Sequence, residues 1–356
     1  MGATGRSEYR KVTCRTLDAL GLNRLMRARN RYDIRVLTLH GVSTVTRGDL
    51  WEPLRPQLDV RLFDAILGKL SKSYDFVSMD RVLASITGKS EPMKNSICLT
   101  FDDGYSNNFR EALPVLEKYE APGTFYVTSG NPVTREPFWF DRLDYVLQEA
   151  ARQGAELEIG GRRFDFESDK REDVSRKYVE LRKFAKRQFP REQEFVDSLN
   201  DLAEKAEEMT GKALKSIFEE DHWSRIVTPD ELSQYASHPL VTIGSHTVNH
   251  LRLSFASSES IASELEESKT KLEAWTGRPV LHFAYPNGDF DNRSIQAVRD
   301  AGYATAVTSD AGVNRVGQNP LSMPRLDFGY TLDSAEVATR VSGLESFLLR
   351  LRSRGA

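Results

Sequence analysis

Cysteine is scarce in this chain, and the two residues present, Cys14 and Cys98, are far apart. They form neither a C-x-x-C pair nor the dense pattern of a disulfide-stabilised domain, so we exclude a disulfide framework and a cysteine metal site. Cys98 stands in the short apolar run 97–99, where a buried thiol is the ordinary interpretation.

An excess of charge of one sign is also missing. The formal net charge of the 356 residues is -3, and such a balance provides no global attraction to nucleic acid. Hydrophobic residues make up 39% and charged residues 28%, proportions that fit a soluble globular protein and argue against disorder. We therefore expect no nucleic-acid partner.

Long hydrophobic runs are absent too. No stretch approaches the ~20 apolar residues of a membrane-spanning helix, and residues 1–15 contain no apolar core of signal-peptide length. We therefore expect a cytoplasmic protein. Residues 1–31 are basic with interspersed leucines, which fits a helix docked on the domain, a solvated arm, or peripheral contact with the inner membrane face. The sequence does not predict the oligomeric state.

What is present is an alternation of apolar strand patterns and amphipathic helix patterns. This alternation predicts an α/β fold with parallel β/α units. Helices are expected at 59–70 and 106–120, and strands at 34–40, 96–101, 123–128, 240–245, 280–285 and 304–308. A capping box at 228–231 and Gly277 mark the start of one helix and the end of another.

The pattern changes between 138 and 225. A hairpin on the Gly160-Gly161 turn is followed by a charged, glycine-poor stretch that we interpret as helices. We therefore predict three parts, namely a basic arm or helix at 1–31, a main domain at 32–137 and 226–345, and a hairpin and helical insertion at 138–225.

Two adjacent carboxylates, Asp102 and Asp103, end the apolar strand at 96–101 and precede Gly104. Buried carboxylates need partners because an unpaired buried charge is costly, and the carboxyl ends of parallel strands are where β/α folds place active sites. By itself Asp-Asp-Gly is equally compatible with a simple turn.

Two of the six histidines, His246 and His250, follow the strand at 240–245. Residues four apart share one side if the segment turns helically, and this spacing suits two imidazole ligands on one metal. With Asp103 they provide three protein ligands and leave a position for water, as catalytic metal sites do. The remaining carboxylate, Asp102, is placed to take the proton of that water.

These segments resemble the polysaccharide deacetylases, the NodB-homology or carbohydrate esterase family 4 group, in its Phe-Ala-Tyr-Pro subgroup. The resemblance covers roughly 34–135 and 225–330. The segments are Leu-Thr-Leu-His-Gly-Val at 37–42, Thr-Phe-Asp-Asp-Gly at 100–104, His-Thr-Val-Asn-His at 246–250, Phe-Ala-Tyr-Pro-Asn-Gly at 283–288 and Met-Pro-Arg-Leu at 323–326.

The resemblance implies a distorted (β/α) barrel of about seven strands and a role for each matched residue. Asp102 would be the general base, and the N–H of Tyr105 would help to stabilise the oxyanion. Tyr285, Pro286 and Asn287 would contribute to the substrate site. Asp103, His246 and His250 would bind one divalent metal, zinc in the first place, with cobalt, nickel or manganese as alternatives.

Two departures from the family pattern matter. Ala284 stands where many relatives carry an arginine that orients the base, so Arg325 is the candidate substitute, unless it is a surface arginine. No histidine occurs after His282, whereas many relatives have a late catalytic-acid histidine. His40 is then the candidate acid, although it could equally be a structural residue at a strand end, and His282 is disfavoured because it precedes its strand.

The expected function is metal-dependent removal of an N-acetyl group from an amino sugar in a polysaccharide, oligosaccharide or lipid-linked glycan, with release of acetate. Deformylation or another C–N amide hydrolysis on the same scaffold is the first alternative. A sugar-binding protein without turnover is the second. Phe138, Trp139 and Phe140 could stack on sugar rings or belong to the core.

Overall fold

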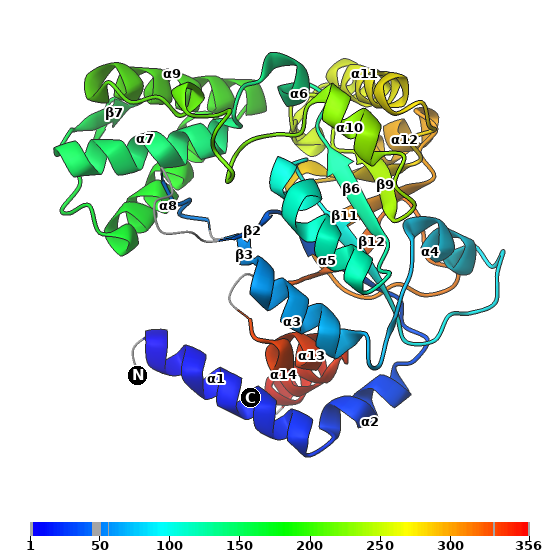
Figure 1. Cartoon of the computed structure of the whole chain (residues 1–356). Coiled ribbons are helices and arrows are strands. Elements are labelled where there is room, and N and C mark those ends of the chain that lie inside the picture. The colour runs from blue at the N-terminus through cyan, green and yellow to red at the C-terminus, as the bar shows by residue number, and fades with distance from the viewer. Residues whose placement is uncertain (1–2, 45–50, 56, 330–331, 355–356) are drawn as a thin grey trace.

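Seven parallel strands form a closed barrel in this computed structural model, which describes residues 3–44, 51–55, 57–329 and 332–354 (Figure 1). β1 pairs with β12 on one side and with β5 on the other, so the ring is complete. The predicted barrel of about seven strands is confirmed. The barrel strands are β1 (Arg35–Leu39), β5 (Ser96–Phe101), β6 (Gly123–Val127), β9 (Val241–Ser245), β10 (His282–Ala284), β11 (Thr305–Ala311) and β12 (Met323–Asp327).

The strands are apolar because helices cover the barrel from outside. Every residue of β5, for example, is buried, as expected for a parallel strand with both faces covered. A short eighth strand, β4 (Asp75–Phe76), pairs with the first residues of β5, on the edge of β5 that faces away from β1. The surrounding helices are α3 (Val60–Leu70), α4 (Met79–Ile86), α5 (Leu113–Lys118), α10 (Pro229–Tyr235), α11 (Ser258–Thr276), α12 (Asn292–Asp300) and α13 (Ser334–Val341).

The predicted helix ends are confirmed at α10 and α11. The Thr228 hydroxyl accepts from the Glu231 N–H at 3.3 Å, while the Glu231 carboxylate accepts from the Thr228 N–H at 2.9 Å. α11 stops at Gly277, which has φ 64°, a value that costs glycine little.

The helix predicted at 106–120 begins differently. A π-helical turn, η1 (Asn108–Ala112), precedes α5, and the Leu113 N–H bonds to the Asn108 carbonyl. Pro114 has no N–H to continue the ordinary ladder, so the widened turn accommodates it.

Residues 139–210, within the segment between β6 and β9, form a second layer beside the barrel, coloured green in Figure 1. The predicted hairpin is present, with Gly160 and Gly161 at φ 56° and 75°. A cluster of buried side chains, from Leu143 to Trp223, joins this hairpin to three helices. The elements are α7 (Trp139–Gln153), β7 (Leu157–Ile159), β8 (Arg162–Phe164), α8 (Arg171–Gln188) and α9 (Glu192–Thr210). The exact domain boundaries stay a prediction.

A buried ion pair ties this layer to the barrel. The Nε of Arg252, in the loop after β9, donates to a Glu192 carboxylate oxygen at the start of α9 over 2.7 Å. Short elements complete the chain, namely β2 (Val42–Ser43), β3 (Leu58–Asp59), α6 (Asn131–Thr134), η2 (Leu214–Ser216), η3 (Leu253–Phe255) and η4 (Pro286–Gly288).

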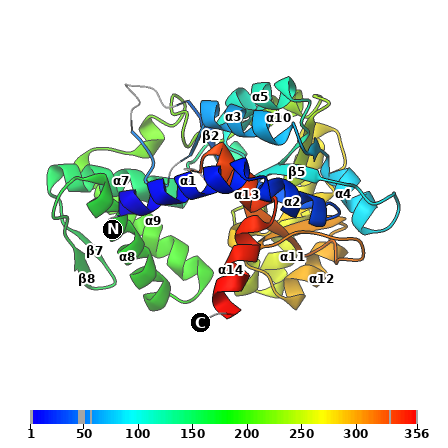
Figure 2. The ribbon, with the colours of Figure 1, turned by 90° about the horizontal axis from the view of Figure 1, so that it is seen from below.

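The basic N-terminal segment forms α1 (Ala3–Ala19) and α2 (Leu22–Arg29), which lie against α13 and α14 (Leu344–Arg354) (Figure 2). Arg10 pairs with Glu336 at 3.2 Å and with Glu345 at 2.6 Å. The segment is therefore a docked helix pair rather than a solvated arm. Across the described ranges, no helix combines the length and the apolar character needed to cross a bilayer.

Candidate active site

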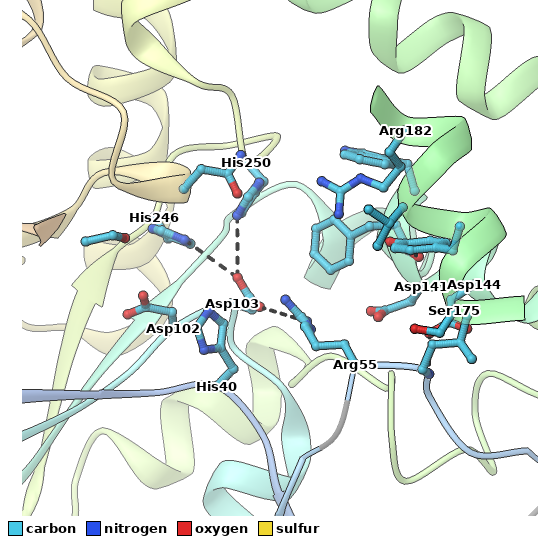
Figure 3. A pocket seen from close by; sticks show the side chains of 17 residues that line it. His40, Arg55, Asp102, Asp103, Asp141, Asp144, Ser175, Arg182, His246 and His250 are labelled. Carbon is cyan, nitrogen blue, oxygen red and sulfur yellow. Dashed lines mark hydrogen bonds and ion pairs between the residues drawn. The ribbon is translucent and has the colours of Figure 1, made fainter. Parts of the chain in front are cut away.

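The candidate site lies where β5 and β9 end, at the carboxyl edge of the barrel. Asp102 and Asp103 directly follow β5, and His246 directly follows β9. Asp103 has φ 75° and Gly104 has φ 86°, so the chain reverses sharply after the strand. A Cβ on Gly104 would lie 2.8 Å from a Val127 methyl, and only glycine fits there. The strained turn brings both carboxylates into one cavity (Figure 3).

Asp103, His246 and His250 form a buried cluster of candidate metal ligands whose donor atoms lie within 4.8 Å of one another. The Asp103 Oδ1 is 3.6 Å from the His246 Nε2 and 3.5 Å from the His250 Nε2. Ligand atoms at the usual bond lengths around tetrahedral zinc are about 3.4 Å apart. Both Asp103–histidine separations are close to this value, so the chemistry and spacing of the donor set fit a divalent metal.

The two imidazoles each direct Nε2 toward the Asp103 carboxylate. The His246 Nδ1 is 2.8 Å from the Ala284 carbonyl, so it donates there and leaves Nε2 with its lone pair toward Asp103. Burial and repulsion by His246 lower the pKa of His250 to about 3. The His250 ring packs edge-on against Phe138 and Phe140, with centroids 5.8 and 5.5 Å away.

The segment 246–250 is not helical, contrary to the turn that the spacing suggested. Thr247 has φ 68° and His250 has φ 55°, so the loop reverses twice. Glu264 of α11 holds the loop by accepting from the N–H groups of Val248 and Asn249 at 2.7 and 3.0 Å. The two rings still meet, with centroids 4.9 Å apart, because this anchored loop replaces the helix.

Asp102 is paired with Arg325, the single arginine of β12. The two guanidinium NH groups donate to the two Asp102 carboxylate oxygens at 2.7 Å each, and the Arg325 Nε donates to the Thr308 carbonyl. Arg325 is 2% exposed, so the surface interpretation is wrong. Burial alone would raise the pKa of Asp102, but Arg325 more than offsets it and holds that pKa below its usual range.

We predict that replacing Arg325 shifts the pH dependence of the reaction. Without the bidentate partner, burial should raise the pKa of Asp102. A base works only when ionised, so its activity is lost as pH falls through its pKa, and a higher pKa moves this loss to higher pH. The acid limb of the kcat/KM profile should therefore shift upward in Arg325→Gln.

Arg325→Lys is the matched control, since it keeps the charge but loses the fork geometry, and it should shift the limb less. Breaking a buried pair costs about 3–5 kcal/mol of stability, so thermal unfolding should be followed in both variants. An unchanged acid limb in folded Arg325→Gln would contradict the assignment.

An antiparallel bridge with Ile226 holds the backbone at Tyr105, two residues after Asp103. The Ser106 N–H donates to the Arg225 carbonyl, and the Val227 N–H donates to the Gly104 carbonyl, at 2.8 and 3.0 Å. These bonds flank Tyr105, whose own N–H has no hydrogen-bond acceptor within the described part of the chain. The N–H is thus available to a ligand oxygen.

His40 follows β1 and lines the same cavity, half-buried, beside Asp102 and Asp103 (Figure 3). Burial lowers the pKa of its imidazole, while the Asp103 carboxylate acts in the opposite direction. His282, in contrast, lies at the other end of its strand, where its ring nitrogens are 2.8 Å from the Thr305 hydroxyl and 3.2 Å from the Asp80 carboxylate.

Comparison with known proteins assigns the family. The sequence model of the family described as polysaccharide deacetylase matches residues 89–306, more than half of the chain, including both aspartates and both histidines. The chain belongs to the polysaccharide deacetylase family.

Curated relatives of this family are distant. A Bacillus subtilis protein, YxkH, provisionally named a polysaccharide deacetylase, is 20% identical over 68% of this chain and 54% of its own length. A Bacillus cereus peptidoglycan-N-acetylglucosamine deacetylase is 34% identical over 19% of this chain and 31% of its own. The chain thus spans about half or less of the curated relatives it matches.

Solved deacetylase structures share the fold. The Streptococcus pyogenes deacetylase PplD, in complex with acetate, superposes with a TM-score of 0.56 at 17% identity, covering 87% of this chain and 99% of that one. IcaB from Ammonifex degensii gives a TM-score of 0.53 at 17% identity, covering 87% and 97%.

The third family motif is only partly at the cavity. Asn287 lines it, but the Tyr285 and Pro286 side chains are buried outside its lining, and the Tyr285 hydroxyl donates to the Leu321 carbonyl at 2.9 Å. A contribution of Tyr285 and Pro286 to the substrate site stays a prediction. The Tyr285 ring belongs to the core cluster between the barrel strands and the surrounding helices, because the chain turns away from the cavity after β10.

The aromatic residues 138–140 have two roles. Phe138 is buried and stacks on Phe140 with centroids 4.8 Å apart, so it belongs to the core beneath His250. Trp139 and Phe140 line the cavity, where they can contact a substrate.

Sequence reasoning missed Arg55. It lies in the segment before β3, with no motif around it, and its guanidinium is 3.5 Å from the Asp103 Oδ2 and 2.7 Å from the Tyr105 hydroxyl. Tyr105 in turn donates to Asp141 at 2.8 Å. Burial raises the pKa of Asp141 to about 8, so this carboxyl is mostly protonated at neutral pH. The positive charge of Arg55 therefore lies beside Asp103, one of the candidate metal ligands.

Proposed function

We propose that this chain hydrolyses the N-acetyl group of an amino sugar in a glycan, releasing acetate and leaving a free amine. The observation that carries the proposal is the ionised Asp102, held by Arg325, beside the buried Asp103, His246 and His250 cluster. Amide hydrolysis needs a base for the attacking water, a group that activates this water, and a hydrogen-bond donor for the developing oxyanion. A carboxylate beside a candidate metal site and a backbone N–H can provide these three functions.

Asp103, His246 and His250 would hold one divalent metal ion. We propose zinc, because two imidazoles and one carboxylate form a ligand set that zinc commonly has, with cobalt, nickel or manganese as the alternatives. Such an ion, when bound, lowers the pKa of a coordinated water and polarises the amide carbonyl.

The protein's own groups would complete the reaction. Asp102 takes the proton of the attacking water, and it can do so because Arg325 keeps it ionised. The N–H of Tyr105 donates to the carbonyl oxygen as negative charge develops there. His40, on the same edge of the barrel, gives a proton to the departing nitrogen. The cytoplasmic location and a peripheral membrane contact stay predictions.

A screen of acetylated and formylated amino sugars tests the proposal. Metal-loaded protein should release acetate from N-acetylglucosamine oligomers, as measured by coupled acetate detection. Formate release alone would identify a deformylase, and metal binding with sugar binding but no acid release would identify a protein without turnover.

We predict that His40→Gln lowers kcat on acetamides while metal content stays unchanged. The acid must be protonated to act, so its deprotonation should produce the high-pH limb of the wild-type rate profile, which the variant should lose. The defect should shrink on an activated amide whose leaving group needs no proton.

His282→Gln is the control, since His282 lies outside the cavity. An equal defect of His40→Gln on both substrates would indicate structural damage at the end of β1. No defect on either would transfer the acid role to another group.

A further inference from the structure

A groove continues from the catalytic cavity along helix α8. The catalytic cavity has a volume of about 310 Å³, and a neighbouring cavity of about 420 Å³ opens beside it. The two share four lining residues, Trp139, Val179, Arg182 and Asn287, so they form one path. Figure 3 shows Arg182 of α8 among the side chains that line the first cavity.

One face of α8 lines the whole path. Ser175, Val179 and Arg182 face the first cavity, and Arg182, Lys183 and Lys186 face the second. These positions recur at intervals of three and four residues, the spacing that puts side chains on one side of a helix. The part of this helix face that lies farther from the catalytic cavity is positively charged, because it carries Arg182, Lys183 and Lys186.

The groove cations lack acidic partners, unlike other cations of α8. Arg176 pairs with Asp173, and Lys177, on another side of the helix, lies near Asp165 and Glu180. In the described part of the chain, no carboxylate lies within 4.0 Å of the Arg182, Lys183 or Lys186 nitrogens. The one carboxylate in the second cavity, Asp289, is 3.5 Å from Arg252.

Aromatic rings accompany the cations. The Arg182 guanidinium lies 5.2 Å from the centroid of Trp139 and 5.4 Å from that of Tyr178, which fixes its position. The Lys186 ammonium is 5.7 Å from the centroid of Phe255, which is 49% exposed. A sugar ring can pack on such faces while its polar substituents meet the cations.

We propose that this groove binds an anionic group, phosphate or carboxylate, carried by the substrate glycan next to the acetylated sugar. The proposal rests on the proposed deacetylase function and specifies its substrate class. The net charge of the chain is -3, so an excess of positive charge is not general to its surface. Arg182, Lys183 and Lys186 nevertheless lie without ion pairs along the groove that leads away from the catalytic cavity. Guanidinium and ammonium groups recognise both kinds of anionic oxygen.

Steady-state kinetics with matched oligosaccharides tests this proposal. The substrates are an N-acetylglucosamine oligomer, the same oligomer with a phosphate on the neighbouring sugar, and one with a uronic acid there. Wild-type protein should have a lower KM for at least one anionic oligomer than for the neutral one. In Lys183→Gln/Lys186→Gln, the KM ratio of that anionic oligomer to the neutral one should rise about tenfold, which corresponds to ~1.4 kcal/mol, because both lysines are exposed and an exposed ion pair contributes little individually.

The matched control is Lys177→Gln, on another side of the same helix, which should leave the ratio unchanged. Which anionic oligomer is preferred decides between phosphate and carboxylate. An equal KM for all three oligomers in wild type, or the same ratio in the double variant as in wild type, would overturn the proposal.

A binding measurement separates this proposal from the deacetylase function. Calorimetric titration of the Asp102→Asn protein with the three oligomers needs no turnover. Preferential binding of an anionic oligomer, lost with Lys183→Gln/Lys186→Gln, supports the groove even if no acetate is released. Acetate release without any anionic preference supports the function and rejects the groove.

Discussion

His246→Ala is expected to abolish tight metal binding and to lower deacetylation by more than the ~10²–10⁴-fold that loss of a general base typically costs. His246 provides one of only three candidate donors in the described cluster, and its orientation is fixed by the Ala284 carbonyl. Its loss would leave two donors for the divalent ion, which, when bound, would supply Lewis acidity and activate water.

Metal analysis after gel filtration measures this effect directly. Wild-type protein should carry about one divalent ion per chain, and zinc, cobalt, nickel and manganese can be tested in turn. His238→Ala is the control, because His238 lies outside the cavity and pairs with Glu117. Full metal occupancy in His246→Ala would show that the ligands are misassigned.

Asp102→Asn is expected to keep the metal and to lose ~10²–10⁴-fold or more in kcat, since asparagine cannot accept the proton of water. Asp103→Asn, one residue on, should lose the metal as well as the rate. The contrast is sharp because the two carboxylates are adjacent, yet one pairs with Arg325 and the other faces the histidines.

Folding must be controlled in this comparison. Asp102→Asn leaves Arg325 buried with a neutral partner, which can cost several kcal/mol. The double variant Asp102→Asn/Arg325→Met removes both charges, and it should also bind metal without turnover. Near wild-type activity in Asp102→Asn would rule out Asp102 as the base.

Much of the barrel could be predicted because its signals are local. β5 and β6 were visible as short apolar runs, and the ends of α10 and α11 as a capping box and a glycine. The prediction was less accurate at 106–120, where Pro114 forces a π turn, and at 246–250, where the anchored loop replaces a helical turn.

Residue types and spacing alone predicted the candidate site only where its residues cluster along the chain, whereas His40 and Arg325 were candidates only through the family resemblance. Asp102 with Asp103, and His246 with His250, stand out because neighbouring residues of one chemical kind follow apolar strands. Arg55 has no such neighbours, and its approach to Asp103 depends on how the segment before β3 crosses the cavity.

The sequence by itself determined most strands of the barrel and the helix caps, and it predicted the four central candidate residues Asp102, Asp103, His246 and His250, because all of these depend on residues close together in the sequence. Only the tertiary structure decided that Arg325, 223 residues from Asp102 along the chain, is its bidentate partner. Closure of the barrel between β1, β5 and β12 creates that contact. The charge of Asp102 follows from it, since burial opposes ionisation and only a partner brought there by the fold can reverse the balance.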